Sequence, residues 1–207
     1  MKYFLSVFLL LMFITTSVIS QEKKHEIQSY TLVSIDEVAY QFLYGIDSGW
    51  EKYIDKVNYG AGFKYSYLLL KRMSPSIGFE AQFMNGKEEN SNYKTNVDLY
   101  HLSLGLVFHL KKSSPFELDL EVDYLLTKAS INQYYNNEWE KDIQDGYGLG
   151  LGLNSRYLIN SISGVNFGIY TKGNVTNLED KSRGGSGFID SYAGIQLEFR
   201  IGYSLEF

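Results

Sequence analysis

Apolar and polar residues alternate along most of the chain. Between residues 97 and 110 the even positions are aliphatic or aromatic, as at Leu102 and Leu104, and the odd positions include His101 and Ser103. A period of two is typical of a β-strand with one face in apolar surroundings. The same pattern predicts eight strands, at residues 36–47, 57–70, 76–86, 97–110, 116–131, 145–158, 163–174 and 189–207.

The connections between these strands alternate in length. Those after the second, fourth and sixth strands are short, whereas those after the first, third, fifth and seventh are long and polar. Such alternation is typical of an up-and-down barrel whose two rims face different compartments. We therefore predict an all-β fold, an eight-stranded antiparallel up-and-down transmembrane β-barrel. Its short turns and both termini are expected to be periplasmic, and its long loops extracellular.

The apolar faces predict what surrounds the barrel. They carry few charges, and aromatic residues gather near the ends of the strands, which is typical of belts at two membrane–water interfaces. The chain also has 18 tyrosines and 13 phenylalanines but only 2 prolines, a composition that favours strands. We therefore expect outer-membrane lipid to contact the apolar face. A soluble periplasmic barrel that binds a ligand inside is kept as an alternative.

The stretch DGYGLGLGLNSRY at 145–157 places a glycine at every second position. Leu151 interrupts the G-x-G-x-x-G spacing of a dinucleotide-binding loop, so that reading fails. In a narrow barrel, glycines on the inner face leave space for large inward side chains. Tyr170 and Tyr192 are predicted to fill this space. The alternative is that the glycines only permit strong curvature.

The N-terminal region and the composition set the compartment. A lysine followed by YFLSVFLLLMFI predicts a signal peptide over residues 1–20. Residues 21–35 show no clear period and are assigned to a periplasmic tail or partial plug, which leaves 36–207 as the barrel domain. The chain has no cysteine, which excludes a lipoprotein anchor and thiol-based metal sites. A net charge of −5 gives no support to a nucleic-acid partner.

The C-terminal sequence IGYSLEF ends on an aromatic residue. With the strand pattern, it makes residues 36–207 resemble the small outer-membrane barrels of the outer membrane protein A and X type, in the broad outer membrane β-barrel domain group. In that resemblance Gly202, Leu205 and Phe207 match the assembly signal of such barrels. It implies assembly in the cell outer membrane by the barrel assembly machinery. We expect a monomer without a cofactor, and no cluster of residues in the sequence offers a set of metal ligands.

Charged residues on the inner face are the main candidates for a functional site. Strand 116–131 carries four carboxylates on alternate residues, spaced by about 6.6 Å. Such a row serves either as a cation path or as part of an ion-pair network, and confinement favours the network because buried charges need partners. The predicted network is Glu117, Asp119, Glu121, Asp123, Lys64, Arg156, Lys172 and Arg200.

The turn at 111–115 sets the expected register of this network. If Leu110 faces Phe116, then His109 lies opposite Glu117, and Arg156 is expected opposite Asp119 or Glu121. A network of this kind plugs the lumen. We therefore expect no diffusion pore.

Two further motifs bear on function. His101-Leu102-Ser103 weakly resembles the His-x-Ser of outer-membrane lipid A deacylases, but Leu104 replaces the asparagine that follows in that family. We therefore predict no catalytic residue. The connection after residue 131 carries Tyr134, Tyr135 and Trp139, which are candidates for binding a sugar or a protein, or else for packing within the loop.

These observations favour a non-enzymatic structural or surface-interaction protein that binds an extracellular ligand or partner through its loops. A lipid A-modifying enzyme remains the alternative.

Overall fold

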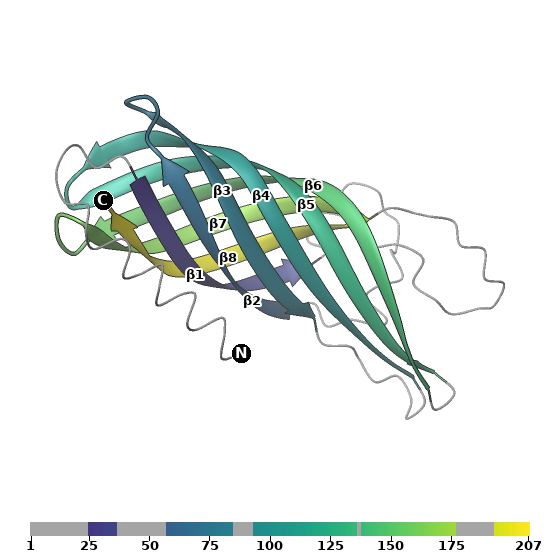
Figure 1. Cartoon of the computed structure of the whole chain (residues 1–207). Coiled ribbons are helices and arrows are strands. Elements are labelled where there is room, and N and C mark those ends of the chain that lie inside the picture. Colours follow the sequence, from purple (N-terminus) through teal and green to yellow (C-terminus); the bar gives the residue numbers. More distant parts are fainter. Residues whose placement is uncertain (1–24, 37–56, 85–92, 136–137, 177–192) are drawn as a thin grey trace.

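The chain folds into a closed antiparallel β-barrel in the computed structural model (Figure 1). The structure describes residues 25–36, 57–84, 93–135, 138–176 and 193–207. These contain eight strands: β1 (His25–Asp36), β2 (Val57–Tyr67), β3 (Met73–Met84), β4 (Tyr93–Ser113), β5 (Phe116–Tyr135), β6 (Glu138–Leu158), β7 (Ser163–Thr176) and β8 (Ala193–Glu206). Each strand pairs with the next, and β1 closes the barrel against β8. The predicted fold class is therefore confirmed.

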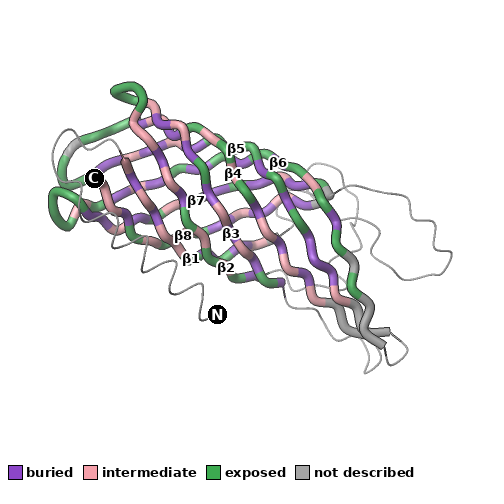
Figure 2. The backbone as a smooth tube through the Cα atoms, in the orientation of Figure 1, coloured by how far each residue is buried: buried purple, intermediate pink, exposed green. Residues whose placement is uncertain are grey.

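The outer surface of the barrel is apolar. Burial alternates along each strand (Figure 2), and exposed leucine, isoleucine, phenylalanine and tyrosine side chains cover the outside of all strands except β1, where Val33 is exposed. Leu149, for example, is 68% exposed, and its neighbours in sequence Gly148 and Gly150 are buried. A closed barrel satisfies its own backbone, and an apolar exterior around a polar interior fits a lipid bilayer. The soluble alternative is therefore wrong.

The described part of the chain holds no helix with the length and apolar composition needed to span a membrane.

The first strand differs from the prediction. Residues 25–35 are not a tail, because they pair with β2 from His25↔Tyr67 to Ile35↔Val57 and with β8 along their length. The alternation of β1 is hidden because Ser29 and Thr31 lie on the outer face and Leu32 is buried inside. The predicted strand 36–47 lies outside the described residues except for Asp36, and so does the signal peptide.

The prediction of a long loop after residue 131 is also wrong. Most of it is strand, since β5 continues to Tyr135 and β6 begins at Glu138. This hairpin runs beyond the last described residues of β3 and β7, where strand pairing does not depend on an apolar face. The other long connections lie outside the described residues.

The turn between β4 and β5 is shorter than predicted, and the register differs as a result. Ser113 pairs with Phe116, so the turn is formed by Ser114 and Pro115 alone. The pairing shifts by one residue between His109 and Lys111, and this irregularity restores the alternation of inner and outer faces. As a result, His109 lies opposite Asp119 and not opposite Glu117.

Candidate functional site

The lumen of the barrel is filled with paired charges. The structure places Glu117, Asp119, Glu121, Asp123, Lys64, Arg156 and Lys172 at 5% exposure or less, and the side chain of Arg200 at 12%. Apart from Asp119, which pairs with His109, these residues and their partners form two groups. The rim cluster, near the short turns and the termini, is Arg156, Glu26, Glu117 and Glu206. The central cluster is Lys64, Lys172, Arg200, Glu80, Glu121, Asp123 and Glu198.

The rim cluster is built around a single guanidinium. Arg156 Nη1 lies 2.5 Å from Glu26 Oε1, and Nη2 lies 2.7 Å from Glu206 Oε1. Nη2 also bonds to Glu117, which stands directly across from Arg156 in the β5–β6 register. The expectation that Arg156 lies opposite Asp119 or Glu121 is therefore wrong. One cation thus joins β6 to β1, β5 and β8.

In the central cluster, Lys172 and Arg200 share two carboxylates. Lys172 Nζ bonds to Glu80 and lies 2.5 Å from Glu198 Oε1. Arg200 Nη2 lies 2.9 Å from the second oxygen of each of the same glutamates. Gln82 Nε2 also donates to both, at 2.8 Å to Glu80 and 2.5 Å to Glu198. Each glutamate therefore keeps a partner if one donor is lost.

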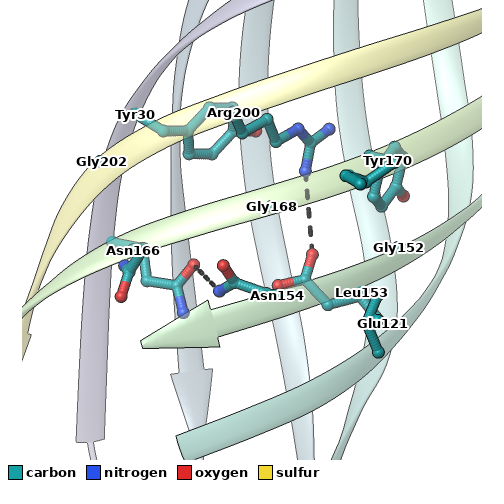
Figure 3. A pocket seen from close by; sticks show the side chains of 12 residues that line it. Tyr30, Glu121, Gly152, Leu153, Asn154, Asn166, Gly168, Tyr170, Arg200 and Gly202 are labelled. Atoms are coloured by element: carbon teal, nitrogen blue, oxygen red, sulfur yellow. Dashed lines mark hydrogen bonds and ion pairs between the residues drawn. The ribbon is translucent and has the colours of Figure 1, made fainter. Parts of the chain in front are cut away.

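The rest of the central cluster surrounds Lys64. Its ammonium lies 2.7 Å from Glu121 Oε2 and 2.8 Å from Asp123 Oδ2, and the hydroxyl of Tyr170 donates to the same oxygen of Asp123. Figure 3 shows Arg200 extending toward Tyr170, with an ion pair to Glu121 at 3.7 Å. The Arg200 guanidinium lies 3.8 Å from the centre of the Tyr170 ring and 4.6 Å from that of Tyr30. Stacking and charge pairing together hold this cation in place.

The alternating glycines of β6 make room for Tyr170. A Cβ atom added at Gly150 or Gly152 would collide with the ring of Tyr170, which is 2% exposed. This confirms the prediction that the glycine face accommodates a large neighbour, and Tyr170 is that neighbour. Tyr192, the second candidate, lies outside the described residues.

A serine, a histidine and an aspartate form a chain at the short-turn end. Ser74 Oγ lies 2.8 Å from His109 Nε2, and His109 Nδ1 lies 2.7 Å from Asp119 Oδ1. The order resembles that of a nucleophilic triad. Ser74 is only 2% exposed, however, so its hydroxyl offers no access to a substrate. The chain acts as a polar link across β3, β4 and β5.

His101 and Ser103 do not form a catalytic pair. His101 is 1% exposed, and its Nδ1 lies 3.0 Å from the Thr127 hydroxyl. That hydroxyl donates in turn to Asn174 Oδ1 at 3.3 Å. Its Nε2 has no hydrogen-bond partner among the described residues. The two side chains fill the lumen and face away from the outer lipid.

Two small spaces lie between these side chains in the described part of the lumen. A cavity of about 20 Å³ is lined by Tyr30, Arg200, Tyr170 and Asn154, among others (Figure 3). A second, of about 10 Å³, lies beside Lys64, His101 and Asp123. A single water needs roughly 10–15 Å³, so these spaces admit one or two waters and no larger solute. Within the described ranges, no group of three or more histidine, aspartate and glutamate side chains could hold a metal ion.

The end of the barrel opposite the turns has a different lining. The inner face of β3, β4 and β5 carries a cluster of apolar side chains exposed by 2% or less, which are Met84, Val97, Leu99, Ala129 and Ile131. Further along, the binding candidates Tyr134 and Tyr135 are in β5 and Trp139 is in β6. Tyr134 and Trp139 are paired in the backbone register. Their side chains are outside the described part of the structure.

The proposed assembly residues lie where the barrel closes. Leu205 pairs with Ile27 of β1 and with Ser163 of β7. The Phe207 ring stacks on His25 with centroids 5.4 Å apart. Gly202 faces the lumen, where an added Cβ would come within 2.8 Å of the Tyr30 Cβ atom. Recognition of this strand by an assembly machinery remains a prediction.

Sequence reasoning missed several members of the clusters. Glu198 and Glu206 alternate with Arg200 in the same inward row, so the pattern that placed Arg200 could have found them. Glu80 lies in a predicted strand whose inner face was not assigned. Glu26 and Tyr30 belong to β1, which was read as a tail, and no signal in that segment indicated them.

Comparison with known proteins identifies the fold. No family model matches the sequence, and no curated protein does. Three solved structures superimpose along most of their length. Neisserial surface protein A has a TM-score of 0.59 and 11% identity, covering 88% of this chain and 97% of its own. The attachment invasion locus protein Ail of Yersinia pestis has a TM-score of 0.54 and 16% identity, and the match covers 90% of this chain and 100% of Ail. The outer membrane protein OprG from Pseudomonas aeruginosa has a TM-score of 0.53 and 12% identity, and the match covers 91% of this chain and 98% of OprG.

Proposed function

Because the chain is a small eight-stranded outer-membrane β-barrel, we propose that it is a non-enzymatic surface-interaction protein with a sealed lumen. The barrel anchors the protein in the membrane. The ends of β4, β5 and β6 that extend beyond the other strands, on the side opposite the termini, bind a partner outside the cell.

The observation that carries this proposal is the unequal height of the barrel wall. Within the described residues, pairing between β3 and β4 extends to Met84↔Val97, whereas pairing between β4 and β5 extends to Tyr93↔Tyr135. Within the same residues, pairing between β6 and β7 extends to Gly146↔Thr176, whereas pairing between β5 and β6 extends to Tyr135↔Glu138. Figure 1 shows these three strands running past the others at the lower right. We call residues 93–96, 132–135 and 138–141 the projecting sheet.

The projecting sheet is suited to recognition. Its backbone is paired as strand, and it includes Tyr134, Tyr135 and Trp139. Aromatic residues are the side chains most often found at the centres of binding interfaces. Lys141 is exposed on the same sheet and adds a charged group to the proposed binding surface. Ail, which shares the fold, is named for attachment and invasion, and this favours testing adhesion first.

The filled lumen supports the absence of catalysis and of bulk transport. The candidate pair His101–Ser103 has no hydrogen bond between its members, and Ser74 is inaccessible. Expression of the parent should leave the acyl pattern of lipid A unchanged. In planar bilayers the protein should give no sustained large conductance. Loss of an acyl chain that depends on Ser103, or stable channels of porin size, would contradict the proposal.

The decisive experiment compares adhesion of cells expressing the parent with cells expressing the triple variant Tyr134→Ala/Tyr135→Ala/Trp139→Ala. We expect the parent to increase retention on an epithelial cell layer and the triple variant to lose that increase. The matched control is Tyr157→Ala, which removes an exposed aromatic residue at the short-turn rim. Heat-modifiable migration in gels verifies that all three proteins fold. Adhesion that is equal in the parent and the triple variant, or absent from the parent, rejects the surface role.

The orientation can be tested separately. External protease on intact cells should cut at Lys141 in the projecting sheet and spare Lys111 beside the β4–β5 turn. Cleavage at Lys111 alone would show that the barrel is inserted the other way round.

A further inference from the structure

Four basic side chains stand together at the short-turn rim. Lys71 and Arg72 form the tip of the turn between β2 and β3, and Lys111 and Lys112 lie at the end of β4 before the next turn. All four residues are exposed. They stand out in a chain whose net charge is −5.

The two turns are neighbours in space, so these cations form one patch. The carbonyl of Arg72 accepts a hydrogen bond from the backbone N–H of His109 at 3.0 Å, and Met73 pairs with Phe108. Adjacent strands lie about 4.8 Å apart, which brings the ends of β3 and β4 side by side. We call Lys71, Arg72, Lys111 and Lys112 the basic rim.

The charge of the basic rim is scarcely neutralised by the protein. Lys112 lies 4.0 Å from Glu206, but that carboxylate is already bound by Arg156 at 2.7 Å. Among the residues that the structure describes, no carboxylate lies within ion-pair distance of Lys71, Arg72 or Lys111. The exposed lysine Lys128 near the opposite rim differs, because it pairs with Asp145 at 3.6 Å.

The surroundings of the basic rim fix its depth in the bilayer. Leu69 and Leu70 precede Lys71 and are 60% and 58% exposed. Leu110, directly before Lys111, is 52% exposed, and Phe116 across the turn is 50% exposed. These side chains form the edge of the apolar belt, so the cations that follow them stand at the level of the lipid headgroups. Long basic side chains are suited to this position because their stems stay in the apolar layer while the charge reaches the headgroups.

We propose that the basic rim binds the phosphate groups of anionic phospholipids in the leaflet that surrounds the short turns, giving the barrel an annulus enriched in phosphatidylglycerol-type lipid. A basic residue near an anionic membrane surface contributes about 1 kcal/mol, or roughly fivefold in affinity. This inference rests on the membrane-inserted fold and is independent of the projecting sheet, so either proposal can fail without the other.

The test measures lipid selectivity around the refolded protein in phosphatidylcholine vesicles. Spin-labelled phosphatidylglycerol and spin-labelled phosphatidylcholine are introduced in parallel, and electron paramagnetic resonance gives the immobilised fraction of each. We expect the parent to prefer phosphatidylglycerol by about fivefold at low salt. Sodium chloride should weaken this preference, because the cations are exposed. The variant Lys71→Gln/Arg72→Gln/Lys111→Gln/Lys112→Gln should show a ratio close to one.

Two controls make the result decisive. Lys128→Gln/Lys141→Gln removes two exposed cations from the other end of the barrel and should keep the parental preference. Added inorganic phosphate should weaken the preference no more than sodium chloride of equal ionic strength does, because the lipid presents its phosphate at the height of the patch. A parent without preference, an equal loss in both variants, or full displacement by inorganic phosphate would overturn the proposal. Unfolding in urea confirms that the basic-rim variant is as stable as the parent.

Discussion

The rim cluster surrounds one cation with three carboxylates, whereas the central cluster gives three cations to four carboxylates. Arg156 is the shared partner of Glu26, Glu117 and Glu206. In the centre, Glu80 and Glu198 each contact both Lys172 and Arg200. The two clusters therefore respond differently to the loss of one residue. A buried carboxylate without a partner is costly, and the number of remaining partners decides how costly.

The largest effect is expected at Arg156. Arg156→Leu leaves three carboxylates without their shared partner at a site where the arginine is 1% exposed. We expect the free energy of unfolding to fall by about 3–5 kcal/mol, the range for breaking a buried pair. Urea unfolding of the refolded protein, followed by heat-modifiable migration, measures this. A variant as stable as the parent would show that the rim cluster is hydrated and contributes little.

Lys172→Met should have a smaller effect although Lys172 is equally buried. Arg200 and Gln82 continue to bind both Glu80 and Glu198 after the lysine is removed. We expect a loss of about 1.5–3 kcal/mol, the range for hydrogen bonds to charged groups. The same urea series provides the measurement. A loss equal to that of Arg156→Leu would remove the distinction between the two clusters.

The central cluster also depends on the space beside Tyr170. Gly152→Ala places a methyl group against the ring that packs on Arg200, and overpacking of this kind costs about 1–3 kcal/mol. Gly173→Ala is the matched control, because no atom lies within 4 Å of the added Cβ. We expect a lower urea midpoint for Gly152→Ala only. Equal midpoints would mean that Tyr170 moves aside without loss.

The smallest expected effect comes from second substitutions in the Arg156→Leu background. Glu117→Gln removes a carboxylate that bonded directly to the guanidinium and should recover about 1 kcal/mol. Asp119→Asn should recover less, because His109 is its direct partner at 2.7 Å. Comparison of the two double variants in the same urea assay sharpens the boundary of the rim cluster. Greater recovery with Asp119→Asn would place that residue inside the cluster.

The sequence predicts the inner row of β5 well because its pattern is unambiguous. Glu117, Asp119, Glu121 and Asp123 alternate with apolar residues, and a period of two leaves no other face for them. The alternation of polar and apolar residues is not clear in β1, because the polar residues Ser29 and Thr31 lie on its outer face. Thr31 is accommodated there because its hydroxyl donates to the carbonyl of Ile201 at 3.5 Å. A polar group satisfied by the neighbouring strand cannot be recognised from sequence alone.

The partners of the charges could not be predicted for a different reason. Register relates neighbouring strands, and on that basis Arg156 was assigned to β5. Two of its three partners come from β1 and β8, and Glu26 is 130 residues away in sequence. In a barrel narrow enough for side chains to meet across the lumen, distant strands contribute as much as adjacent ones. Only the closed structure identifies these contacts.

The joint between β1 and β8 also determines the order in which the barrel can be completed. His25 and Phe207 exchange backbone hydrogen bonds of 3.0 and 2.9 Å, although they lie at opposite ends of the barrel sequence. Contacts between residues so far apart in sequence form slowly, and we expect them to form late in folding. The rim cluster requires Glu26 and Glu206 at the same arginine, so it too must wait for the final strand. A chain that lacks β8 would therefore expose the unpaired edge of β1. Its Arg156 guanidinium would also lack Glu206 as a partner, so a truncated barrel differs chemically from a complete one.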